Sequence, residues 1–228
     1  MFKPRLTKPE KGNKFYITIS AGGYSRAIVG KPTDPNCNVL SNCVGYAFGR
    51  FHEIQNNTKM NCFDPVNAEN IFANAIAHGM KVGKEPKLGA AIVWQKGETL
   101  SQADGAGHIA IVEQINADGS ITLSESGYNC KNPFWTSVMK PPYSYGTGYK
   151  LLGFIYQPES VPAVTIKRGM HGDAVKWLQE KLYEHGYLRK IEIDGDFGNI
   201  TFGALLAFQF DNGLVVDGVC GAQTKAKL

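Results

Sequence analysis

The pattern of hydrophobic and polar positions changes near residue 160 of the chain. Before this point, short apolar runs lie between turn-forming residues, which is typical of strands; beyond it, apolar residues recur at helical spacing. The stretch between the two regions, residues 157–163, contains two prolines and no periodicity, which indicates a linker. We therefore expect a domain at residues 1–157, a linker at 158–165 and a second domain at 166–228.

An amphipathic helix is predicted to begin at Cys43. The apolar residues that recur at helical spacing after it are Val44, Ala47, Phe48 and Phe51. Ser41 and Asn42, which precede it, are residue types that cap the N-termini of helices. This pattern places Cys43 on the first turn of a helix that packs against the core through one face.

A β-hairpin is predicted further along the chain, with strands at 107–115 and 120–128 joined by the turn 116–119. The register of the hairpin is described by the sum of the numbers of two residues that pair across it. If this sum is odd, His108, Glu125 and Gly127 share one face, and Glu125 lies diagonal to His108. An even sum brings Ser124 or Ser126 to that face instead. We expect the glycines before His108 to leave room for a substrate beside its ring.

The C-terminal region contains a 23-residue repeat of the form apolar-Asp-Gly-x-x-Gly-x-x-Thr. Its motif residues are Asp194, Gly195, Phe197, Gly198 and Thr201 in the first unit, and Asp217, Gly218, Gly221 and Thr224 in the second. The glycines suit tight turns, and each threonine caps or begins the helix that follows. Cys220 occupies the position of Phe197, so we expect it to be a core side chain.

Composition indicates a folded protein without a membrane span. Of 228 residues, 43% are hydrophobic and 19% are charged, which allows a sizeable core and excludes disorder as the main state. No apolar run approaches the roughly 20 residues that cross a bilayer. The N-terminus has no apolar segment of the kind found in secretory signals, so we expect synthesis in the cytoplasm.

The charge is mildly basic, with a net charge of +4. The first 14 residues hold five basic side chains, while the rest of the chain is nearly neutral. This distribution does not provide the broad basic stripe of a nucleic-acid-binding protein. The basic N-terminal arm fits either an acidic polymer or a solvated tail.

Five cysteines, an odd number, are present at positions 37, 43, 62, 130 and 220. None forms a CxxC pair, which argues against a zinc ribbon or a thioredoxin-type site, and free thiols fit a reducing compartment. The helix N-terminus predicted at Cys43 stabilises a thiolate by about 0.3–1 kcal/mol at an exposed site. Because the thiolate is the nucleophilic form, Cys43 is the candidate nucleophile. The alternative is a small buried hydrophobic side chain.

His108 is the candidate base for Cys43. The other four histidines lie at helix ends or in the C-terminal region: His52, His78, His171 and His185. Glu125, diagonal to His108 in the odd register, is placed to orient the imidazole as the third member of a Cys–His–acid set. The alternative for Glu125 is a solvent-facing strand carboxylate.

The N-terminal region resembles the CHAP domain, the cysteine- and histidine-dependent amidohydrolases/peptidases, over roughly residues 20–157. The segments that carry the resemblance are Asn42-Cys43-x-Gly45-Tyr46-Ala47, Gly107-His108-Ile109-Ala110-Ile111-Val112 and Ser124-Glu125-Ser126-Gly127. The resemblance implies a papain-like α+β fold with an antiparallel sheet. It also implies that Cys43 is the nucleophile, His108 the general base and Glu125 its orienting acid. In the reaction expected of this set, the backbone N–H of Cys43 and the side chain of Asn42 hold the oxyanion. Many members add an Asn two residues after the acid, where this chain has Gly127; Asn129 is the nearest substitute.

Residues 166–228 resemble the three-helix peptidoglycan-binding domain of cell-wall hydrolases. The resemblance rests on Asp194-Gly195-x-Phe197-Gly198-x-x-Thr201 and Asp217-Gly218-x-x-Gly221-x-x-Thr224 with their flanking helices. It implies a small all-α domain that binds the bacterial wall. The alternative is a generic helical module.

Together, the two resemblances imply a peptidoglycan hydrolase similar to bacteriophage endolysins, which cleaves an N-acetylmuramoyl–L-alanine amide or a stem or cross-bridge peptide bond. The rival interpretations are a non-catalytic wall-binding protein with a decayed CHAP fold and a transglutaminase-like acyltransferase. The expected partner is bacterial peptidoglycan, without nucleic acid or membrane insertion. No cofactor is required. Some phage enzymes of this family bind calcium just before the nucleophile, where Asp34, Asn36 and Asn38 offer oxygens at alternate positions but make an ordinary turn equally well.

Overall fold

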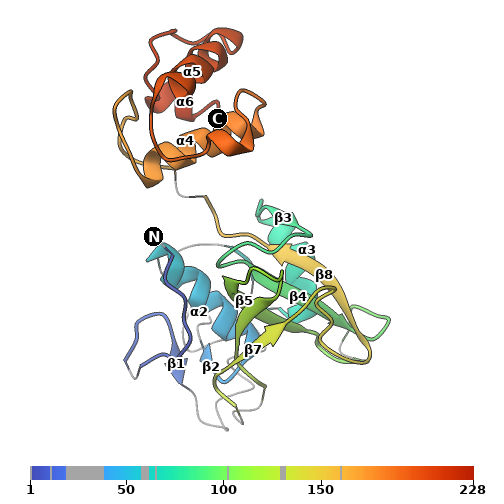
Figure 1. Cartoon of the computed structure of the whole chain (residues 1–228). Coiled ribbons are helices and arrows are strands. Elements are labelled where there is room, and N and C mark those ends of the chain that lie inside the picture. The colour runs from blue at the N-terminus through green and yellow to red at the C-terminus, as the bar shows by residue number, and fades with distance from the viewer. Residues whose placement is uncertain are drawn as a thin grey trace. The chain divides into compact units, whose positions relative to one another are not determined.

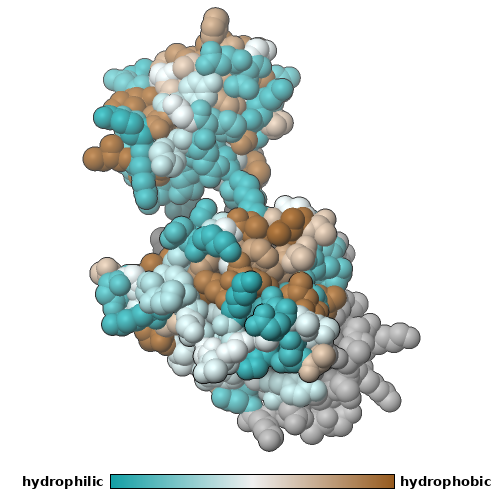
Figure 2. Space-filling view, turned by 90° about the vertical axis from the view of Figure 1, so that its right-hand side faces the viewer, coloured by the Kyte–Doolittle hydropathy of each residue, from teal (hydrophilic) through white to brown (hydrophobic). Residues whose placement is uncertain are grey.

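The computed structural model describes residues 2–10, 12–18, 39–57, 62–64, 66–101, 103–128, 132–159 and 161–228. The chain divides into two compact units, residues 2–158 and 159–228 (Figure 1). Each unit has a hydrophobic core of its own. On the face in Figure 2 both units are largely hydrophilic, with hydrophobic residues in separate patches.

The N-terminal unit is built on a six-stranded antiparallel sheet with the strand order β3-β8-β4-β5-β6-β7. The strands are β3 (Val82–Gly83), β4 (Ala91–Lys96), β5 (His108–Ile115), β6 (Ile121–Glu125), β7 (Trp135–Met139) and β8 (Tyr149–Ile155). A separate parallel pair consists of β1 (Ile17–Thr18) and β2 (Val39–Leu40). The predicted antiparallel sheet is confirmed.

Helices α2 (Cys43–Gln55) and α3 (Ala68–Ala77) pack on one face of this sheet, against Ile109 and Ile111 of β5 (Figure 1). The opposite face carries Trp94, Ala110 and Val112, which form a second apolar cluster. Alternate residues of β5 are therefore buried on both sides, which accounts for its nearly unbroken apolar sequence. The α+β prediction is confirmed.

The register of the β5–β6 hairpin changes along its length. Next to the turn, Ile115 pairs with Ile121, an even sum of residue numbers. A β-bulge between Val112 and Gln114 then shifts the pairing, so that Ile111 lies opposite Ser124, an odd sum. The end of the hairpin that carries His108 thus has the odd register.

The C-terminal unit is helical, as predicted. It contains α4 (Asp173–Glu184), the short 3-10 helix η2 (Lys190–Glu192), α5 (Asn199–Asp211) and α6 (Ala222–Lys225). Cys220 has no exposed surface and lies in the same apolar cluster as Phe197, which confirms it as a core side chain.

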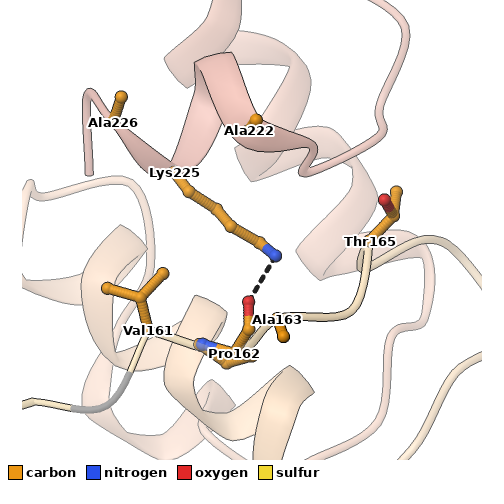
Figure 3. Close-up of a pocket in the computed structure, with 7 residues that line it drawn as sticks. All are labelled: Val161, Pro162, Ala163, Thr165, Ala222, Lys225 and Ala226. Atoms are coloured by element: carbon orange, nitrogen blue, oxygen red, sulfur yellow. Dashed lines mark hydrogen bonds between the residues drawn. The ribbon is translucent and has the colours of Figure 1, made fainter.

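The predicted linker is held at its start by the N-terminal unit and in its later part by the C-terminal unit. The side-chain amide of Gln55 donates to the carbonyl of Pro158 at 3.0 Å. Beyond it, Lys181 forms an ion pair with Glu159, and Lys225 Nζ donates to the carbonyl of Pro162 at 2.5 Å (Figure 3). These bonds leave a short stretch around residue 159 as the junction.

The expectation of a solvated N-terminal arm is wrong at Arg5. Its guanidinium forms an ion pair with Glu53 of α2, and its backbone N–H donates to Glu113 Oε2 at 2.8 Å. The side chain is 14% exposed, because it pairs with the half-buried carboxylate of Glu53 and lies over the ring of Tyr16. Among the described residues, no helix is long and apolar enough to span a membrane.

Candidate active site

Cys43 is the first residue of α2, as predicted, and its helix is capped by Asn42. The side-chain oxygen of Asn42 accepts the N–H of Val44 at 3.0 Å, which satisfies one of the free donors of the first turn. The thiol is partly exposed. The sulfur therefore lies at the positive end of a fixed helix, within reach of solvent.

Hydrogen bonds join the start of α2 to the end of β6. The backbone N–H of Asn42 donates to Ser126 Oγ at 3.0 Å, and Ser41 Oγ donates to the carbonyl of Gly127 at 2.6 Å. These bonds hold the helix that begins with Cys43 next to the strand that ends with Glu125.

His108 and Glu125 are in direct contact. The Nε2 atom of His108 lies 2.9 Å from Glu125 Oε2, and both residues are buried. The hydroxyl of Ser137 donates to the other oxygen of Glu125. The carboxylate is thereby fixed between the imidazole and β7.

Cys43 also interacts with the imidazole of His108. Burial of the imidazole acts to lower the pKa of His108, but its interactions with Cys43 and Glu125 outweigh this effect and raise the pKa to about 9. The raised pKa favours the protonated imidazole at neutral pH. Since Glu125 occupies Nε2, Nδ1 is the nitrogen left to face the sulfur.

Three aromatic rings surround the imidazole. The ring centroid of Tyr145 lies 4.4 Å from that of His108, and those of Trp94 and Trp135 lie 6.0 and 6.3 Å away, all near parallel to it. Aromatic faces attract a cation, so this arrangement favours the imidazolium.

Sequence reasoning missed Ser137 and these rings. The pairing of strands accounts for two of the rings, since Trp94 pairs with His108, and Trp135 with Glu125. Ser137 is two residues along β7 from Trp135, and therefore on the same face.

The prediction that glycines leave room beside His108 is wrong for Gly107. A Cβ atom on this residue would lie 2.4 Å from the carbonyl oxygen of Trp94 and 2.7 Å from Glu69 Cβ. Its φ of +71° also favours glycine. Gly107 thus allows close backbone packing, and the space beside it is filled by protein.

The other described cysteines are buried. Burial raises the pKa of Cys62 to about 12 and that of Cys220 to about 11, so both remain thiols at neutral pH. Cys37, Cys130, Asn129 and the proposed calcium ligands Asp34, Asn36 and Asn38 lie outside the described residues. Within the described ranges, no group of three or more His, Cys, Asp or Glu is arranged to hold a metal ion.

The other histidines have different surroundings. His78 Nε2 lies 3.1 Å from Asp64, and His171 Nδ1 lies 2.5 Å from Asp196. His52 is fully buried against the ring of Phe48.

In the C-terminal unit, the first repeat is organised around the buried side chain of Gln179. Its Nε2 donates to Asp194 Oδ1 at 2.7 Å and to Thr201 Oγ1 at 2.9 Å, while its Oε1 accepts the N–H of Gly195 at 2.8 Å. Hydrogen bonds from the backbone N–H of Asp196 and from the Gln179 amide hold the pKa of the Asp194 carboxyl below its usual value. Gly195 has a φ of +84°, as expected for the tight turn.

The second repeat reproduces this arrangement around Gln209. The amide donates to Asp217 Oδ1 at 2.9 Å and to Thr224 Oγ1 at 3.3 Å, and accepts the N–H of Gly218 at 2.9 Å. In both repeats the threonine lies in the first turn of the next helix, whose N-cap is Gly198 in one and Gly221 in the other. The motif residues therefore build the turns of the unit, and their contact with the wall stays a prediction.

Two cavities lie in the C-terminal unit. One, of about 460 Å³, is open and lies between residues 161–165 and α6, with Lys225 across it (Figure 3). The other, of about 250 Å³, lies beside the second repeat and is lined by Gln209, Leu214 and Asp217 among others.

Comparison with known families gives one match within each of the two units. Residues 33–127 match the CHAP domain, and residues 171–228 match a peptidoglycan binding domain. These matches cover the residues on which the two resemblances rest.

Individual relatives match over about a quarter of the chain. The spore cortex-lytic enzyme of Halalkalibacterium halodurans is 43% identical over 63 residues, 28% of this chain and 19% of the relative. The N-acetylmuramoyl-L-alanine amidase CwlM of Mycobacterium tuberculosis is 39% identical over 59 residues, 26% of this chain and 14% of the relative. The chain thus spans about a fifth or less of the length of these two proteins.

Among solved structures, an N-acetylmuramoyl-L-alanine amidase from Staphylococcus aureus is 27% identical, with a TM-score of 0.37. The match covers 45% of this chain and 28% of that one.

Proposed function

Because the chain carries a CHAP domain at residues 33–127 and a peptidoglycan-binding domain at residues 171–228, we propose that it is a peptidoglycan hydrolase. It cleaves an amide bond of the bacterial cell wall through a cysteine acyl-enzyme. The observation that carries this proposal is the 2.9 Å contact of His108 with Glu125, together with the interaction of the same imidazole with Cys43 at the start of α2. This arrangement argues against a decayed, non-catalytic CHAP fold.

In the first step, the thiolate of Cys43 attacks the carbonyl carbon of the wall amide. The positive end of α2 and the imidazolium of His108 both stabilise the thiolate before attack. The oxyanion that forms accepts a hydrogen bond from the backbone N–H of Cys43. Because the oxygen of Asn42 caps the helix, the NH₂ of the same side chain is the group that serves as the second donor.

The imidazolium of His108 then donates its Nδ1 proton to the leaving amine, and the C–N bond breaks. This step leaves a thioester on Cys43 and a neutral imidazole. The imidazole takes a proton from water, whose oxygen attacks the thioester, and loss of the thiolate restores the ion pair. Glu125 keeps the ring oriented throughout, as the acid of a catalytic triad does.

The C-terminal unit has a separate role in this proposal. Residues 159–228 bind peptidoglycan and hold the N-terminal unit close to its substrate, which raises the effective substrate concentration. Among the described residues of this unit, the one cysteine, Cys220, is fully buried, so the unit has no exposed thiol to act as a nucleophile. A phage origin and synthesis in the cytoplasm stay predictions from the sequence.

Mass spectrometry of digested wall tests the proposal and identifies the bond. Purified peptidoglycan incubated with the full chain should release fragments with new amine and carboxyl termini. A free lactyl carboxyl on the sugar identifies an N-acetylmuramoyl–L-alanine amidase, the activity named for CwlM, whereas new termini within the peptides identify an endopeptidase. Digestion that yields only cleaved glycosidic bonds, or no cleavage, contradicts the proposed function.

A further inference from the structure

Glu113 is a fully buried carboxylate that lies between the elements carrying the three site residues. Two of its hydrogen bonds come from the guanidinium of Arg50, whose Nε and Nη2 atoms each lie 2.8 Å from a carboxylate oxygen. Ser124 Oγ donates to Oε1 at 2.7 Å, and the backbone N–H of Arg5 donates to Oε2 at 2.8 Å. Four donors therefore satisfy a carboxylate that has no contact with water.

Apart from Arg5, which belongs to the N-terminal segment, the partners of Glu113 lie on the helix that begins with Cys43 and on the strand that ends with Glu125 (Figure 1). Arg50 lies on α2, two turns from Cys43. Ser124 precedes Glu125 on β6, and Glu113 itself lies on β5, the strand that begins at His108. The hydroxyl of Tyr46, also on α2, donates to Ser124 Oγ at 2.7 Å and closes the connection between helix and strand.

Glu113 is also the extra residue of the β5–β6 bulge, which shifts the pairing between Val112 and Gln114. Continued to the end of the hairpin, the odd register brings His108 opposite Gly127, with Glu125 diagonal to it on the same face. Without the bulge, the even register of the turn would continue. Ser126 would then be diagonal to His108, and Glu125 would point to the other face.

We propose that Glu113 is a positioning residue of the hydrolase. By anchoring the bulge to α2 and β6, it selects the register in which Glu125 reaches the imidazole and fixes the distance between the helix of Cys43 and the strand of His108. The inference rests on the proposed function, but the register itself exists whatever the substrate is. Glu113 acts through other residues and does not touch the reacting atoms.

The test compares Glu113→Gln with a matched control, Glu53→Gln, in the full chain. Glu53 accepts from the same guanidinium, with Arg50 Nη1 at 2.8 Å, but its bonds go to α2 and the N-terminal segment. Both substitutions remove a carboxylate from Arg50, so both are expected to lower stability. Only Glu113→Gln places an amide NH₂, which is a hydrogen-bond donor, next to the donors that surround position 113 at the bulge.

Two readouts separate positioning from stability: the NMR titration of the His108 imidazole and the kcat on soluble wall fragments. Cys43, Glu125, Trp94, Trp135 and Tyr145 are the groups that face this ring. With Glu113→Gln, His108 should lose its proton at lower pH, and kcat should fall about 10- to 100-fold, as for a misplaced catalytic group, with KM little changed. Glu53→Gln should leave both readouts as in the wild type.

If Glu113→Gln does not fold, Ser124→Ala provides the test, because it keeps the ion pair between Arg50 and Glu113. It should shift the His108 titration in the same direction by a smaller amount. The proposal is overturned if folded Glu113→Gln has the His108 titration and the kcat of the wild type. If Glu113→Gln does not fold, the same result in Ser124→Ala overturns it. An equal shift of the His108 titration in Glu53→Gln would also overturn it. If the wild type cleaves no wall, the proposed function fails, whereas the titration still decides whether Glu113 sets the position of Glu125.

Discussion

The imidazole of His108 lies between a sulfur and a carboxylate, and this position determines how activity should depend on pH. Burial opposes the charged form, but the interactions with Cys43 and Glu125 raise the pKa of His108 from 6.5 to about 9. Donation of a proton to the leaving amine requires the imidazolium. Activity should therefore persist through neutral pH and fall as the pH rises through about 9.

Glu125→Gln tests this assignment. The amide retains the shape of the side chain but removes a charge that raises the pKa of His108, so the alkaline limb of kcat/KM should move to lower pH. The raised pKa also stabilises the fold: this contribution is complete below pH 6.5 and is lost as the pH rises through about 9. An unchanged alkaline limb, together with loss of activity in Ser126→Ala, would contradict the proposed role of Glu125.

At the scale of single residues, the sequence predicted those members of the site that are marked by their immediate neighbours in the chain. Cys43 follows a capping residue and opens an apolar helical face, and His108 and Glu125 lie on adjacent strands of one hairpin. Ser137, Trp135 and Tyr145 come from segments whose distance to the site depends on strand pairing across the sheet. Nothing in their immediate sequence specifies that pairing.

Among the elements, the β5–β6 hairpin illustrates where prediction from sequence ends. Alternation and the Asn116–Gly119 turn predict both strands, and Gly119 N donates to the carbonyl of Asn116 at 3.0 Å as such a turn requires. The turn alone sets an even register. The shift to an odd register depends on a bulge whose anchor, Arg50, comes from a helix 63 residues away in the chain.

The repeated turns of the C-terminal unit make a second prediction at the level of elements. Gln209→Ala leaves the N–H of Gly218 and the groups of Asp217 and Thr224 without their common partner. Loss of these buried bonds should lower the stability of this unit by about 1–3 kcal/mol. Thermal unfolding of the full chain should show the loss, with the exposed Gln223→Ala as control. Equal melting of the two variants would mean that the amide does not stabilise the turn.

At the scale of the whole molecule, the two units should divide binding and cleavage between them. Since the units separate near residue 158, fragments 1–158 and 159–228 provide the test together with the full chain. Fragment 159–228 should sediment with purified peptidoglycan. Fragment 1–158 should cleave soluble wall fragments about as fast as the full chain, but cleave intact wall more slowly at low enzyme concentration. If fragment 1–158 sediments with the wall and fragment 159–228 does not, the C-terminal unit is a structural appendage.

We predict that hydrolysis requires no cofactor. Activity and melting temperature should then be the same in a strong chelator and in millimolar calcium. If chelation lowers both and calcium restores them, a site at Asp34, Asn36 and Asn38 is the alternative, because a ligand that binds the folded state stabilises it. The variant Asp34→Ala should then abolish the effect of calcium.

The most direct test of the central claim is the rate at which Cys43→Ala releases new termini from purified peptidoglycan. The variant should fold and sediment with the wall as the wild type does, since Cys43 is partly exposed and outside the binding unit. Without the nucleophile, release should fall to the background of the assay, while Cys62→Val, which replaces a buried thiol, retains activity. Release of termini by folded Cys43→Ala at the wild-type rate would contradict the acyl-enzyme mechanism.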